Sequence, residues 1–244
     1  MSKHLTNNRS ETRAVVITCE HGGNRVPARY RKCFVGAEET LVSHRGWDPG
    51  ALKLAREFAT VIAAPLFSAT VTRLLVELNR SPGHRKLFSE FTESLPVDEK
   101  GKLLVDHWQP YRDEVQQAIS EAIGTTGRVL HLSVHSFTPI WNGEFRKTDV
   151  GLLYDPRRGS ELDFCRRWGR AISVAEPELT VHRNAPYRGT SDGFVTALRR
   201  QFSGDVYTGL ELEVNQKYFL SPKSDQSSFF KSLITSFQQT LHKD

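Results

Sequence analysis

The chain has 244 residues, of which 38 % are hydrophobic and 25 % are charged, and its formal net charge is +5. This composition is that of an ordinary globular protein. No apolar run approaches the roughly 18 residues that cross a bilayer, so we expect no membrane partner. The basic residues are scattered without an aromatic-basic motif, so we also expect no nucleic-acid partner. A mild positive charge instead suits a small anionic substrate in an arginine-lined cleft.

The three cysteines, Cys19, Cys33 and Cys165, form no metal-type pair such as CxxC. An odd number without such pairs argues against a disulfide scaffold and favours a reducing, cytoplasmic localisation. The first residues are polar and lack the apolar segment of a secretory signal. We therefore interpret residues 1–12 as a disordered leader and residues 13–244 as one folded domain.

In chain order, residues 14–19 are a β-branched apolar run, which predicts a strand buried on both faces. Residues 48–62 predict a helix, with Asp48 as a candidate N-cap and Pro49 at the first helical position. The segment 65–80 predicts one or two strands. Later segments alternate in the same way, with strands expected at 128–137, 149–155 and 208–219 and helices at 108–124, 159–172, 194–202 and 224–243.

Buried strands thus alternate with helices from end to end, with no internal repeat, linker or low-complexity block. This pattern predicts a single-domain α/β fold in which a mixed sheet is flanked by helices on both faces. In open α/β sheets, ligands bind beyond the carboxyl ends of the strands. Polar residues at strand exits are therefore the first candidates for a functional site.

Several expected strands end in residues suited to metal binding or acid–base chemistry. Glu20 and His21 follow the first strand, His135 lies in a later one, and Glu211 and Glu213 share one face of the last. A hydrolytic zinc ion usually has three ligands from His, Asp and Glu, and a nearby carboxylate accepts the proton of its water. The alternative is structural: hydrogen-bonded histidines at strand ends and two carboxylates on a wet edge strand. P-loop, dinucleotide-binding and serine-nucleophile motifs are absent.

Six short motifs occur in order along residues 14–220, and together they resemble the N-formylglutamate amidohydrolase family. They are "CEHGGNRVP", "HRGWDPGA", "VELNRSP", "LSVHSF", "NAPYRGTSDG" and "GLELEVNQ". The resemblance implies the fold of the related zinc carboxypeptidases and of the aspartoacylase and succinylglutamate desuccinylase group. It also implies that residues 13–244 are a catalytic domain that uses one zinc ion to hydrolyse the amide bond of an N-acylated acidic amino acid.

For the metal, the resemblance points to His21 and His135. The first metal motif of the aspartoacylase-like group reads HGNE, whereas this chain has "HGGN", so Asn24 stands where the glutamate ligand would be. A neutral amide oxygen is a poorer zinc ligand than a carboxylate. The third ligand is therefore open between Asn24, Glu20 and Asp48.

For the substrate, the match of "ELNR" to the group's "DLNR" implies that Asn79 and Arg80 hold a carboxylate, a task that suits a bidentate guanidinium. Arg73 matches the arginine that polarises the carbonyl, and Glu213 matches the catalytic glutamate. The "NAPYRG" loop resembles the family's NxPY loop, which implies three further residues near the substrate: Asn184, Tyr187 and Arg188.

We therefore expect a zinc-dependent amidohydrolase that acts on N-formylglutamate or a similar N-acyl acidic amino acid. One alternative is a peptidase or amide hydrolase that acts on a larger acidic peptide. Another is a degenerate relative that binds an acidic ligand without turnover, for which the "HGGN" motif is the reason.

Overall fold

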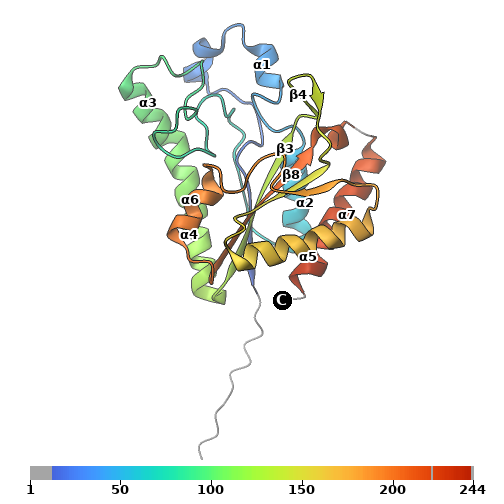
Figure 1. Cartoon of the computed structure of the whole chain (residues 1–244). Coiled ribbons are helices and arrows are strands. Elements are labelled where there is room, and N and C mark those ends of the chain that lie inside the picture. The colour runs from blue at the N-terminus through green and yellow to red at the C-terminus, as the bar shows by residue number, and fades with distance from the viewer. Residues whose placement is uncertain (1–12, 221, 243–244) are drawn as a thin grey trace, which may run out of the picture.

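A six-stranded mixed sheet runs through the middle of the molecule (Figure 1). The computed structural model describes residues 13–220 and 222–242, so the expected leader, residues 1–12, lies outside the described residues. The strand order across the sheet is β2 (Leu66–Ser68), β1 (Ala14–Cys19), β3 (Val129–Phe137), β8 (Tyr207–Asn215), β6 (Val150–Leu153) and β7 (Val181–Arg183). Neighbouring strands are parallel except β6 and β8, which are antiparallel. The predicted mixed sheet is confirmed.

Helices cover both faces of this sheet, as the alternating pattern predicted. On one face lie α2 (Ala51–Ile62), α5 (Gly159–Ala175) and α7 (Lys223–Leu241); on the other lie α4 (Gln109–Thr126) and α6 (Phe194–Gln201). Because β3 is covered on both faces, every one of its residues is buried. Its sequence alternates all the same, with Leu130, Leu132 and Val134 set between the buried polar residues His131, Ser133 and His135.

The largest core cluster fills the space between the sheet and the first of these helix layers. Its centre is aromatic: the ring of Trp168 in α5 lies 4.9 Å from that of Phe237 in α7 and 6.3 Å from that of Phe58 in α2. These edge-to-face contacts join the three helices of this layer through one fully buried side chain.

A third layer of short elements lies beside the carboxyl end of the sheet. It consists of η1 (Ala28–Phe34), α1 (Glu38–Val42), α3 (Val97–Leu103) and η2 (Leu104–Trp108), and it has a small core of its own. Beyond β3 the chain forms a two-stranded hairpin, β4 (Ile140–Trp141) and β5 (Glu144–Phe145), and η3 (Gln216–Phe219) follows β8. The hairpin has Asn142 and Gly143 at its turn, both at positive φ.

One local prediction was wrong. Helix α2 begins at Ala51 after Gly50, which has a φ of 83° and makes no side-chain cap, so Asp48 is not the N-cap. The segment 65–80, predicted as one or two strands, forms one, the three-residue strand β2, and the rest of it leaves the sheet. Asp48 and the residues after β2 both bring polar side chains toward the carboxyl edge of the sheet.

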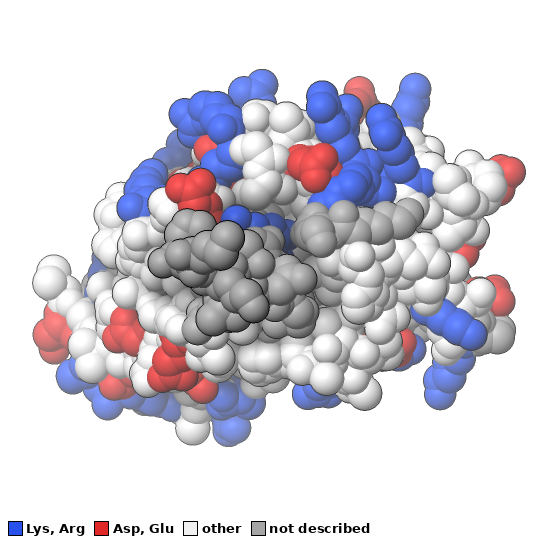
Figure 2. Space-filling view, turned by 90° about the horizontal axis from the view of Figure 1, so that it is seen from below, with Lys and Arg blue, Asp and Glu red and all other residues white. Residues whose placement is uncertain are grey.

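The parallel strands β1, β3 and β8 all end at that edge. In the pairing of β3 with β8, Ser133 lies opposite Glu211 and His135 lies opposite Glu213. The opposite end of the molecule is seen in Figure 2, where the Lys and Arg side chains outside the grey atoms are interspersed with Asp and Glu. Among the described residues, the search for a helix that could cross a bilayer found none.

Replacing Trp168 tests the aromatic centre of the core. Trp168→Ala should lower the free energy of unfolding by about 3–5 kcal/mol, because it leaves a large cavity among three helices. It also removes the hydrogen bond that the indole Nε1 donates to Ser236 Oγ (3.1 Å). Urea denaturation measures the change. The control is Val174→Ala on the same helix, whose side chain is exposed and whose effect should stay within about 0.5 kcal/mol. Equal effects of the two variants would contradict the assignment.

Candidate active site

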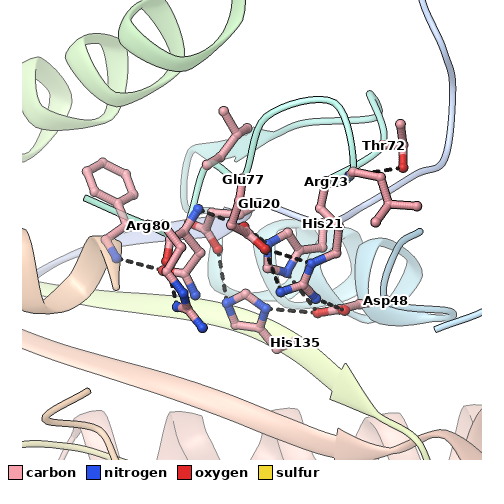
Figure 3. Close-up of polar contacts among 12 residues, drawn as sticks. Glu20, His21, Asp48, Thr72, Arg73, Glu77, Arg80 and His135 are labelled. Carbon is pink, nitrogen blue, oxygen red and sulfur yellow. Dashed lines mark hydrogen bonds and ion pairs between the residues drawn. The ribbon is translucent and has the colours of Figure 1, made fainter. Parts of the chain in front are cut away.

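Three buried side chains from separate parts of the chain meet at the carboxyl edge of the sheet (Figure 3). His21 follows β1, His135 belongs to β3, and Asp48 lies in the loop before α2. Asp48 Oδ2 is 2.9 Å from His135 Nδ1 and 3.3 Å from His21 Nδ1. One ligand atom from each residue lies within 4.8 Å of the other two. The predicted convergence of the two histidines is present in the structure.

This group has the donor set of a divalent metal site. Two imidazole nitrogens and one carboxylate are the usual protein ligands of a hydrolytic zinc ion, which keeps a further position for water. Both histidines direct the same ring atom, Nδ1, toward Asp48, so a single ion near Asp48 can reach all three. The residues present therefore fit a zinc ion.

A second carboxylate lies behind each histidine. Glu77 Oε1 is 2.5 Å from His21 Nε2, and Glu20 Oε2 is 3.1 Å from His135 Nε2. Carboxylates in this position fix the tautomer and the orientation of metal-binding imidazoles. Burial opposes ionisation of both glutamates, but contacts with Arg73 and His21 for Glu77, and with His135 and Ser133 for Glu20, lower their pKa values.

His135 and Asp48 shift each other's titration in opposite directions. Burial by itself would lower the pKa of His135, but hydrogen bonds to Asp48 and Glu20 raise it well above its usual value. Burial would raise the pKa of Asp48, and the positive charge of His21 together with hydrogen bonds to both imidazoles lowers it. The carboxylates of this group therefore favour positive charge beside them, either as protons on the imidazoles or as a bound cation.

Asn24, the sequence-based first choice for the third ligand, is not brought to the two histidines. Its amide Nδ2 donates a hydrogen bond to the carbonyl of Leu41 (3.0 Å), and it is not among the residues that line the site cavity. Asp48 takes the place beside the imidazoles instead, and Glu20 lies behind His135. The correction has a simple cause: the turn after β1 directs Asn24 to the third layer, so the carboxylate comes from a loop 27 residues beyond His21.

Arg73 lies beside the candidate ligands and is held by two of the buried carboxylates. Its Nε donates to Glu77 Oε2 (2.7 Å) and its Nη1 to Asp48 Oδ1 (3.1 Å). About 25 % of its side chain is exposed, and it lines the cavity. The structure thus brings Arg73 to the site, and its role toward a carbonyl stays a prediction.

Glu213 reaches the same cavity from β8, opposite His135. Only 6 % of the residue is exposed, and its Oε2 is buried without a hydrogen-bond partner among the described residues. Burial raises the pKa of Glu213 to about 8, with the carboxylates of Asp48 and Glu211 adding to the rise and the positive charge of His135 opposing it. A divalent cation beside it would lower this pKa, because an opposite charge favours the carboxylate.

Asn79 and Arg80 also line the cavity, but part of each side chain is already used. Asn79 Oδ1 accepts a hydrogen bond from the backbone N–H of Phe194 (2.6 Å). Arg80 Nη1 donates to the carbonyls of Asn79 (2.8 Å) and Asp192 (2.7 Å), which orients the guanidinium. Its Nε is buried and has no partner among the described residues. Arg80 therefore keeps donors for an anionic ligand, whereas the amide oxygen of Asn79 is taken.

The loop that follows β7 supplies Tyr187 and Arg188 to the cavity. Asn184 does not join them: its Oδ1 accepts hydrogen bonds from the backbone N–H groups of Tyr154 and Gly189, both 3.0 Å, so it shapes the loop. The loop is also tied to β8 through Arg199, which donates to the carbonyls of Gly189 and of Gly209 (2.9 Å) and pairs with the buried Glu161 (3.0 Å).

These side chains enclose a cavity of about 700 Å³. Its lining combines the candidate metal group and Glu213 with several cationic side chains, which are Arg45, Arg73, Arg80, Arg85, Lys86 and Arg188. Such a site is suited to a small anionic molecule, because its cations attract the ligand and its buried centre excludes water.

Comparison with known proteins shows the family to which the chain belongs. The sequence model of the N-formylglutamate amidohydrolase family matches residues 13–220, and the chain belongs to that family of hydrolases. No curated protein sequence matches it. A gene product from Agrobacterium tumefaciens is similar in structure, with a TM-score of 0.76, 26 % sequence identity, and coverage of 94 % of this chain and 90 % of that chain. The N-formylglutamate amidohydrolase from Ralstonia eutropha has a TM-score of 0.66 at 18 % identity, with 95 % of this chain and 94 % of that chain covered.

Sequence reasoning missed three features of the site. It attached no role to Glu77 itself within "ELNR", it favoured an N-cap for Asp48 over a metal ligand, and it expected no strand between residues 137 and 149, where the hairpin with Trp141 lies. A signal existed only for the last, because the Asn142-Gly143 pair is a strong short-range indication of a hairpin. The other two depend on long-range contacts that no local pattern encodes.

The third metal ligand can be identified by comparing two substitutions. Asp48→Ala should weaken zinc binding by more than about 100-fold, because loss of an outer partner alone typically costs about 10–100-fold. Asn24→Ala should leave zinc affinity within about twofold. Competition with a chromogenic chelator measures the dissociation constant, and elemental analysis measures the bound zinc. Loss of zinc in Asn24→Ala but not in Asp48→Ala would show that the sequence-based assignment was the correct one.

Proposed function

We propose that the protein is a zinc-dependent amidohydrolase that cleaves the amide bond of a small N-acyl amino acid, with an acidic amino acid such as glutamate on the amine side. The observation that carries the proposal is a buried carboxylate, Glu213, with an oxygen that has no partner among the described residues, in the same cavity as a His–Asp–His group. Family membership supports the hydrolase class.

His21, Asp48 and His135 would hold the zinc ion, and Glu20 and Glu77 would orient the two imidazoles. When bound, zinc supplies Lewis acidity, which polarises a carbonyl and brings the pKa of a water down to about 7. Arg73, held by Asp48 and Glu77, presents its exposed part to the same cavity and adds positive charge where a carbonyl oxygen would become negative.

Glu213 is the general base in this proposal. It accepts the proton of the attacking water while the water oxygen bonds to the acyl carbon, and it then gives that proton to the amide nitrogen as the carbon–nitrogen bond breaks. The products are a carboxylic acid and a free amino acid. The burial that raises the pKa of Glu213 makes it a better proton acceptor once a cation has restored its charge.

Arg80 would hold a carboxylate of the amino acid, and Arg188 lines the same cavity. Its backbone-held guanidinium is already oriented, so little side-chain entropy is lost when a carboxylate binds.

The degenerate-binder alternative rested on the missing carboxylate of "HGGN". Since Asp48 offers that carboxylate, this alternative loses its reason.

Glu213→Gln tests the general base. The variant keeps the shape of the side chain but cannot accept the proton, so kcat for glutamate release should fall by about 10²–10⁴-fold. Bound zinc, measured by elemental analysis, should stay near the wild-type content. Glu211→Gln is the matched control, because Glu211 lines the same cavity two residues away on the same strand. A larger loss of kcat in Glu211→Gln would show that the wrong carboxylate was chosen.

Arg80→Ala tests recognition of the carboxylate. KM for N-acyl glutamate should rise strongly, by about 10–100-fold, because a carboxylate in the cavity would lose its charged partner. Arg80→Lys should restore only part of the affinity, since an ammonium cannot form the two parallel hydrogen bonds of a guanidinium. Steady-state kinetics with acidic and neutral N-acyl amino acids give both numbers. Wild-type discrimination in Arg80→Ala would remove Arg80 from the binding site.

A further inference from the structure

One wall of the cavity has no role in the proposed chemistry. Trp141 of the β4–β5 hairpin and Tyr187 of the loop after β7 both line the cavity, and both are substantially exposed, at 50 % and 43 %. Aromatic side chains that line a cavity are characteristic of ligand-binding sites.

One arginine contacts both rings, and the ring of His44 also packs edge-to-face against that of Trp141, with the centroids 6.2 Å apart. The guanidinium of Arg146 lies 5.1 Å from the ring centroid of Trp141, 5.2 Å from that of Tyr187 and 5.4 Å from that of Phe137. Its Nη1 donates a hydrogen bond to Tyr187 Oη (3.0 Å), and its backbone N–H donates to the carbonyl of Pro139 (2.8 Å). The wall formed by Phe137, Trp141 and Tyr187 is therefore built before any ligand arrives.

The wall and Arg80 lie on opposite sides of the metal group along the strands. Figure 3 shows Arg80 upstream of His135 along β3 and Asp48 downstream of it. The positive charge of Arg80 acts to lower the pKa of Glu211, whereas that of Arg73 acts to lower the pKa of Glu213. Phe137 is two residues beyond His135 on the same strand, which is about 6.6 Å further on. The hairpin follows directly, beyond the tip of β3 in Figure 1.

This order sets the direction of the substrate, given the proposed function. An N-acyl amino acid carries its carboxylate on the amine side of the scissile bond, so a carboxylate on Arg80 places the acyl group toward Phe137 and Trp141. A formyl group has only a hydrogen beyond its carbonyl carbon and would leave this wall in contact with water. The cavity of about 700 Å³ is also in the range of sites for much larger molecules.

We propose that the acyl group of the substrate is a large apolar or aromatic one, of the phenylacetyl class, which packs against Trp141 and Tyr187. The inference rests on the proposed function for the reaction itself, and it adds a subsite for the acyl side. Trp141 is then a specificity-determining residue, because its ring contacts the acyl group and not the reacting atoms.

Substrate preference tests the proposal directly. Zinc-loaded protein is assayed for glutamate release from N-formyl-L-glutamate and from N-phenylacetyl-L-glutamate. We expect kcat/KM to be at least about tenfold higher for the phenylacetyl compound, since even a single methylene in an apolar pocket changes this ratio by about 10–200-fold. Equal or higher kcat/KM for the formyl compound would overturn the acyl subsite while leaving the amidohydrolase function intact. Release of glutamate from neither compound would overturn the proposed function, and the subsite with it.

Two substitutions in the hairpin make the test specific. Trp141→Ala should lower the phenylacetyl-to-formyl ratio of kcat/KM by about tenfold, because it removes an aromatic contact and its buried area. Phe145→Ala is the matched control: Phe145 is on the same hairpin, is 80 % exposed and is not part of the cavity lining. It should leave the ratio unchanged. A ratio that is the same in wild type and Trp141→Ala would overturn the assignment of Trp141.

The direction of binding has its own control. N-Formyl-L-phenylalanine places an aromatic group on the amine side of the scissile bond. If its hydrolysis, and not that of the phenylacetyl compound, depended on Trp141, the wall would bind the amine side and the proposed direction would be wrong.

Discussion

The site depends on the carboxylate of Asp48, which is buried among two imidazoles and one guanidinium. Glu20, Asp48 and Glu77 all have pKa values below their usual range, and of these three buried carboxylates Arg73 pairs with two, Asp48 and Glu77. With neutral imidazoles, two negative charges remain in a region of low dielectric, where they are costly. Protons on the histidines or a divalent cation can compensate them, so the binding of a metal there is coupled to the release of protons.

The strand ends that carry this group were predictable because local patterns determine them. β1 is an apolar run, as expected for a strand covered on both faces, whereas β3 and β8 alternate apolar residues with polar ones. Parallel strands place their carboxyl ends at one edge, so the meeting of His21, His135 and Glu213 followed from the element order and the family motifs. The short strand β2 and the third layer have weaker patterns, and only the packing of distant residues defines them.

The rest of the site could not be predicted from local sequence patterns, because the role of each side chain depends on partners that are distant in the sequence. Asp48 precedes a proline at the start of a helical pattern, which is typical of an N-cap, yet its carboxylate contacts His21, just after β1, and His135 in β3. Asn79 and Asn184 belong to motifs that suggest substrate contact, but backbone N–H groups at distant positions occupy their amide oxygens. Contacts of this kind connect residues more than 25 positions apart.

The connection of Arg199 to the loop after β7 bears on the thermodynamics of recognition. This side chain binds carbonyls on both the loop and β8, and Glu161 neutralises its charge within the protein interior. Tyr187 and Arg188 are thereby anchored to the strand that carries Glu213. Ordering a free surface loop around a ligand typically costs about 0.5–1.5 kcal/mol for each immobilised side chain. Because the folded protein already orders this loop, ligand binding does not incur that entropy cost and does not require the loop to close.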